Sequence, residues 1–109
     1  MRVRKNKKRR WHFKAERVHD FAFAADPDYV HQQIDIQNGP VVHLLYDPET
    51  ANEANWELLK TDYLQRYFDF MADHFGAYPY PQFSIIQGGD GGMEYPMCTM
   101  ILGGGDKFE

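Results

Sequence analysis

The strongest constraint on the fold is a run of apolar residues at helical spacing between residues 50 and 76. Large apolar side chains recur there every three or four residues, which is the repeat of an α-helix. They form two rows, one of Trp56, Leu59, Tyr63, Tyr67 and Phe70, the other of Leu64, Phe68, Met71 and Phe75. We therefore expect one long helix that is buried over more than half of its circumference, with its aromatic residues in the core.

Specific residues mark the ends of this helix. Thr50 and Glu53 fit a capping box, in which the side chain of each residue accepts from the backbone N–H of the other. Gly76 stands where a left-handed cap is expected, and the YPYP sequence of residues 78–81 prevents further helix.

Strand patterns lie on both sides of the helix. Residues 11–23 alternate roughly between apolar and polar side chains, which predicts one or two strands. Short strands are also expected at residues 29–36, 41–46, 83–87 and 97–102. The order of strands, one long helix and further strands predicts an α+β fold with a helix packed on a mixed sheet.

Charge divides the 109-residue chain into a basic start and an acidic remainder. Residues 1–17 hold nine of the twelve Lys and Arg residues and a single acid, Glu16. We predict a disordered basic tail at residues 1–10, because a block of like charges repels itself, and one domain over residues 11–109. The acidic remainder argues against a nucleic-acid-binding domain. No apolar run is long enough to span a membrane or to form a signal peptide, so no membrane partner is expected and the localisation stays open.

The metal-binding residue types show no recognisable spacing. The five histidines are scattered and no H-E-x-x-H sequence occurs, so we expect no zinc ligand and no catalytic residue in this chain. Cys98 is the single cysteine and has apolar neighbours, which favours an inert buried thiol.

A glycine-rich segment and the glutamate after it are the candidate binding residues. Residues 88–92, GGDGG, have no following G-K-[ST], which excludes a P-loop. These glycines either let the backbone approach a ligand or form a flexible surface hairpin. At the rim of a glycine-lined cleft, the Glu94 carboxylate could bind an ammonium group by a charge-assisted hydrogen bond. The alternative is a solvated glutamate at a strand edge.

These residues resemble a known family. GGME at residues 91–94 resembles the G-x-M-E-N exopeptidase motif of the aminopeptidase N-like zinc metallopeptidases (gluzincins), in particular of bacterial members of the Bacteroidetes type. FGAYPYP at residues 75–81 is similar to the end of a helix in that family. WHFKAE at residues 11–16 and DFAF at residues 20–23 are similar to the junction between its N-terminal and catalytic domains. The resemblance covers roughly residues 11–102 and implies that residues 11–109 are the first part of a thermolysin-like catalytic domain.

The resemblance also implies roles for individual residues. It implies that Glu94 binds the free α-amine of a peptide substrate. It also implies that the backbone of Gly91, Gly92 and Met93 lies along that substrate. Tyr95 stands where the family commonly has Asn, which leaves the substrate preference open.

The implied parent is a zinc aminopeptidase that hydrolyses N-terminal residues from peptides. The zinc-binding H-E-x-x-H of the family follows its motif, whereas this sequence reaches Glu109 without one. The segment alone is therefore expected to bind no zinc and to be inactive, with zinc the cofactor of the parent.

Two other functions stay open. One is a non-catalytic module that binds peptide N-termini through Glu94, and the other is an interaction protein whose basic tail binds an acidic partner such as nucleic acid. A partial domain also exposes apolar surface, so self-association is expected.

Overall fold

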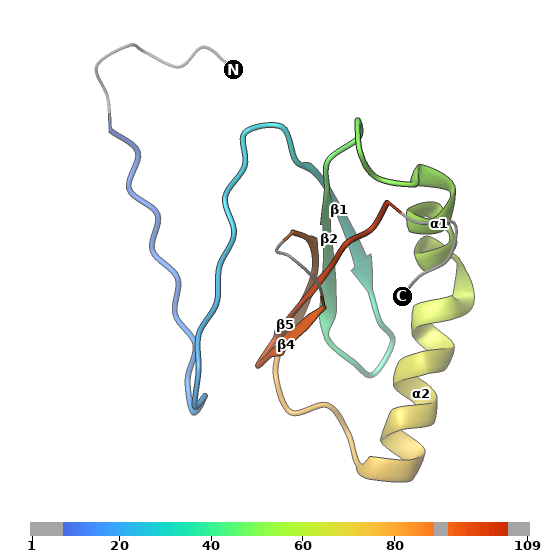
Figure 1. The fold of residues 1–109 in the computed structure, drawn as a ribbon. Helices are drawn as coiled ribbons and strands as arrows, with labels where there is room; N and C mark the ends of the chain where they lie inside the picture. The colour runs from blue at the N-terminus through green and yellow to red at the C-terminus, as the bar shows by residue number, and fades with distance from the viewer. Residues whose placement is uncertain (1–7, 89–91, 105–109) are drawn as a thin grey trace.

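The chain folds into a mixed sheet with one kinked helix packed on a face of it (Figure 1). The computed structural model describes residues 8–88 and 92–104. The strands are β1 (Val30–Asp35), β2 (Val41–Tyr46), β3 (Gln82–Gln87), β4 (Met93–Tyr95) and β5 (Cys98–Ile101), and they lie in the order β1-β2-β3-β5-β4. Strands β2, β3 and β5 are parallel, and β1 and β4 are antiparallel strands at the two edges. The predicted α+β class with a mixed sheet is confirmed.

The helix connects β2 to β3 and has three parts. These are α1 (Glu53–Leu58), a π-helical turn (Leu59–Tyr63) and α2 (Leu64–Phe75). Thr61 in the π-helical turn has a non-helical ψ of −159°, so the helix is kinked there. The helix ends as predicted at Gly76, which donates its N–H to the carbonyl of Ala72. Its φ of 95° and ψ of 161° are not those of the predicted left-handed cap, but they too are accessible mainly to glycine. No helix in the described part of the chain is long and apolar enough to cross a membrane.

The predicted capping box is wrong. The N-cap is Asn52, whose side chain accepts from the N–H of Asn55 at 3.4 Å. The carbonyl of Asp47 accepts from the N–H groups of Thr50 and Ala51, so the chain still turns at Thr50 and the helix begins later.

The predicted burial of both apolar rows is also wrong. Trp56, Leu59, Leu64 and Phe68 are buried, whereas Tyr63, Tyr67, Phe70 and Phe75 are 48–76% exposed. The reason is the two-layer architecture: a single sheet covers only one face of the helix, and nothing among the described residues covers the other face.

The core lies between the helix and the central strands. On β2, Val42, Leu44 and Tyr46 point toward the helix and are 0–2% exposed. The Trp56 ring stacks on Tyr46 with 4.9 Å between centroids, and its indole N–H donates to the Gly103 carbonyl at 3.1 Å. Gly103 has a φ of 73°, and a Cβ there would lie 2.9 Å from the Trp56 ring, so the close approach requires glycine.

The predicted strands at residues 11–23 are wrong. Residues 8–28 contain no strand and form an arm on the side of the sheet away from the helix (Figure 1). Trp11, Phe13, Phe21 and Phe23 are 50–71% exposed. The Tyr80 hydroxyl donates to the Arg17 carbonyl at 3.3 Å and fixes one point of the arm. Most of the predicted basic tail at residues 1–10 lies outside the described residues.

Candidate functional site

The candidate binding residues lie on β4, an edge strand of the sheet. β4 pairs with β5 in an antiparallel hairpin, and no strand in the described part of the chain lies on its other side. The hydroxyl of Thr99 donates to the Met93 carbonyl at 3.2 Å, which ties the two strands together. The outer edge of β4 therefore offers backbone N–H and C=O groups to an additional strand.

Glu94 projects from this edge strand into solvent. It is exposed and lies opposite Thr99, which in turn lies opposite Ile85 of β3. Because side chains alternate between the faces of a sheet, Glu94 shares the face of Ile85, and Ile85 belongs to the core under the helix. The Glu94 carboxylate thus stands at the uncovered margin of the helix-bearing face, with no ion pair to the described residues.

The glycine-rich segment, residues 88–92, starts after β3 and leads into β4. The N–H of Gly88 donates to the Ile101 carbonyl at 3.0 Å as the chain leaves β3, and Gly92 leads directly into β4. Met93 is 47% exposed. Gly92, Met93 and Glu94 thus follow one another along the sheet edge, and Gly91 lies outside the described residues.

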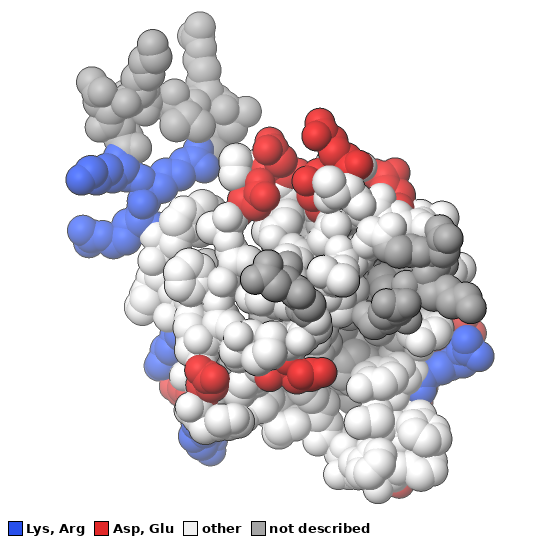
Figure 2. Space-filling view, in the orientation of Figure 1, with Lys and Arg blue, Asp and Glu red and all other residues white. Residues whose placement is uncertain are grey.

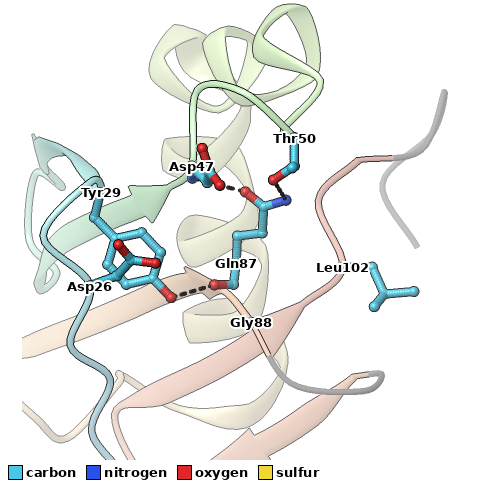
Figure 3. Close-up of a pocket in the computed structure, with 7 residues that line it drawn as sticks. All are labelled: Asp26, Tyr29, Asp47, Thr50, Gln87, Gly88 and Leu102. Atoms are coloured by element: carbon cyan, nitrogen blue, oxygen red, sulfur yellow. Dashed lines mark hydrogen bonds between the residues drawn. The ribbon is translucent and has the colours of Figure 1, made fainter.

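A pocket of about 280 Å³ opens at the same end of the sheet (Figure 3). We call it the strand-end pocket; its lining residues are Asp26, Tyr29, Asp47, Thr50, Gln87, Gly88 and Leu102. Asp47 follows β2, Gly88 follows β3 and Leu102 follows β5. The pocket therefore lies at the carboxyl ends of the parallel strands, which is where open α/β sheets bind ligands.

Gln87 holds the wall of this pocket together (Figure 3). The Tyr29 hydroxyl donates to the Gln87 backbone carbonyl at 2.6 Å. The Gln87 side chain accepts from the Asp47 N–H at 2.9 Å and donates to the Thr50 hydroxyl at 3.2 Å. These bonds fix the loop after β2 against the end of β3.

The strand-end pocket has an acidic lining. Asp26 and Asp47 contribute carboxylates, and none of the lining residues that the structure describes is basic. Burial raises the pKa of the Tyr29 hydroxyl, and the two carboxylates raise it further, so this hydroxyl remains a hydrogen-bond donor. Figure 2 shows acidic side chains gathered at the end of the molecule where the loop after β2 lies.

The strand register relates the pocket to Glu94. Gln87 lies opposite Ile101, and Met93 lies opposite Met100, so the pocket and the start of β4 share one end of the sheet. They are separated by β5, and two strand spacings of about 4.8 Å put them roughly 10 Å apart.

Residues 8–88 and 92–104 bring together no group of three or more His, Cys, Asp or Glu side chains that could hold a metal ion. His31 and His43 form a pair, with 2.8 Å between Nε2 and Nδ1, but no third ligand joins them. The zinc that the resemblance implies for a longer parent would therefore need ligands from outside the described residues. Cys98 is buried as predicted, and burial raises the pKa of its thiol.

Sequence reasoning did not find the strand-end pocket. The available signal was the position of Asp47 and Gly88, each directly after a predicted strand, but the parallel order that brings them together was not predicted. No model of a known protein family matches the chain, and no curated protein matches it.

Proposed function

We propose that β4 binds an extended peptide and that the Glu94 carboxylate holds its free N-terminus. The chain would then be the substrate-binding segment of a zinc aminopeptidase with a thermolysin-like catalytic domain. One observation carries the proposal: Glu94 is exposed on an edge strand whose outer side has no strand neighbour in the described structure.

An edge strand and a carboxylate recognise different parts of a peptide. An extended peptide adds to the free edge through backbone hydrogen bonds, which give affinity without regard to sequence. A carboxylate binds an ammonium group by charge-assisted hydrogen bonds, which are about twice as strong as neutral ones. Together they select a peptide by its free end.

The residues of this chain would contribute binding and orientation. Orientation accelerates a reaction only where the substrate is held against the reacting groups. Under this proposal, hydrolysis depends on zinc ligands that the described residues do not supply.

The same observation supports a second candidate, a non-catalytic module that binds peptide N-termini. The two candidates share Glu94 and the edge strand and differ only in turnover. Zinc content and hydrolysis of an aminoacyl chromogenic substrate distinguish them, when measured on this chain and on any longer polypeptide that contains it.

The binding step is tested with Glu94→Gln and a pair of peptides that differ only in N-terminal acetylation. We expect the unaltered protein to bind the free peptide roughly 10- to 100-fold more tightly, because acetylation removes a charge-assisted hydrogen bond. Glu94→Gln should abolish this preference in a calorimetric titration.

Glu49→Gln is the matched control, because Glu49 is an exposed glutamate away from β4. It should retain the preference for the free N-terminus. If Glu94→Gln bound both peptides as the unaltered protein does, Glu94 would not be the amine anchor and both candidates would fall.

A further inference from the structure

We propose that two copies of this chain associate through the exposed face of their helices, packed antiparallel. This inference is independent of peptide binding, since it concerns the face of the helix that points away from the sheet.

An aromatic stripe follows this face. We define it as Tyr63, Tyr67, Phe70 and His74, which succeed one another at steps of four, three and four residues and therefore lie in one line along the helix. Tyr63, Tyr67 and Phe70 are 53%, 48% and 54% exposed. Phe70 and His74 already stack on one another, with 4.0 Å between ring centroids. The stripe is a continuous ring surface that the sheet of the same chain does not cover.

Exposed apolar surface continues across the kink onto α1. Leu58, the last residue of α1, is 55% exposed. Leu58, Tyr63 and Arg66 line one shallow groove, together with Leu59 and Thr61. The exposed apolar surface thus continues past the kink.

The steps of four and three residues are those of a coiled-coil seam. In an antiparallel pair with this seam, Tyr67 of one copy packs beside Phe70 of the other, and Tyr63 packs beside His74. The two-fold symmetry repeats each contact, so the association closes at two copies.

Charge complementarity identifies a second copy as the occupant. Arg66 and Asp73 flank the stripe on the same side and are seven residues apart. The antiparallel pairing places Arg66 of each copy opposite Asp73 of the other. Within one copy, Arg66 contacts Asp62 at 3.3 Å in an exposed ion pair, and Asp73 has no ion pair with the described residues. Association therefore gives Asp73 a partner of opposite charge.

Charge reversal tests this arrangement, with sedimentation equilibrium of the 109-residue chain as the measurement. The unaltered chain should show a reversible monomer–dimer equilibrium. Arg66→Asp and Asp73→Arg should each weaken it by about tenfold or more, because two attractive pairs become two repulsive ones. The double variant restores opposite charges and should recover most of the affinity.

Circular dichroism checks that each variant keeps its fold, which is expected because both side chains are exposed. Phe70→Ala should weaken the dimer through the stripe itself. A chain that stays monomeric up to submillimolar concentration would overturn the proposal and leave the stripe to a different partner. A dimer whose affinity the double variant does not recover would overturn the antiparallel pairing.

Discussion

Residues 11–23 and strand β2 are both rich in large apolar side chains and have opposite structures. Residues 11–23 alternate roughly between apolar and polar side chains, whereas β2 is an apolar run interrupted only by His43. Leu44 on β2 is fully buried, whereas Phe23 in the arm is 68% exposed. β2 has a hydrogen-bonded strand on each side and a helix over one face, and the arm belongs to no strand. An apolar pattern alone thus does not specify a buried strand; β2 is buried because neighbouring strands satisfy its backbone and the helix covers its apolar face.

The largest expected effect tests this contrast directly. Leu44→Ala removes a fully buried side chain, and we expect it to lower the free energy of unfolding by about 2–5 kcal/mol. Phe23→Ala, the control from the arm, should change it by about 0.5 kcal/mol or less. Urea denaturation measures both values. Equal losses would show that the arm is as well packed as β2.

The next largest effect is a loss of stability at Gly103, which tests whether the packed region extends to this residue. Gly103→Ala combines an unfavourable positive φ with a clash against Trp56, so a loss of about 2 kcal/mol or more is expected. Gly76→Ala is the control for backbone strain without a clash, because Gly76 has a positive φ but a Cβ there meets no atom within 4 Å. Thermal unfolding measures both variants, and a loss below about 1 kcal/mol in Gly103→Ala would exclude tight packing at Gly103.

The smallest effect concerns the other face of β2, where His43 contacts His31. Burial lowers the pKa of His43 and the neighbouring His31 lowers it further, against an opposing effect of Asp35. The unfolded chain therefore binds a proton more readily, and stability should fall as the pH drops below about 6.5.

His43→Gln should flatten this pH dependence of the melting temperature between pH 8 and pH 5, values chosen to bracket the ordinary histidine pKa of about 6.5. His19→Gln, a substitution at an exposed histidine of the arm, is the control for loss of a histidine outside this pair. An unchanged slope in His43→Gln would assign the pH dependence to other groups.

Local signals in the sequence were sufficient for most of the elements. The helix, its end at Gly76, and the strands around residues 41–46 and 83–87 depend on periodicity and on glycine and proline, which act within a few residues. The start of the helix could not be predicted in this way. Asn52 donates its N–H to the carbonyl of Gly103, and that contact depends on the tertiary fold.

The candidate site likewise has one part that local sequence signals identify and one part that depends on the tertiary fold. Glu94 and its glycines are adjacent in sequence and could be singled out there, and their role in binding stays a prediction. The strand-end pocket joins residues from 26 to 102, and only the parallel pairing of β2, β3 and β5 brings them together.

The strand order also has a kinetic consequence. The β1–β2 hairpin closes through a short turn, because Ile36 accepts from Gly39 at its tip. The parallel pair β2–β3 forms only after residues 47–81 have folded back across the sheet. Longer loops cost more entropy to close, and non-local pairings slow folding. We therefore expect the hairpin to form early and the β2–β3 register to set the folding rate, so that nascent chains pass through a state in which the β3-facing edge of β2 is unpaired.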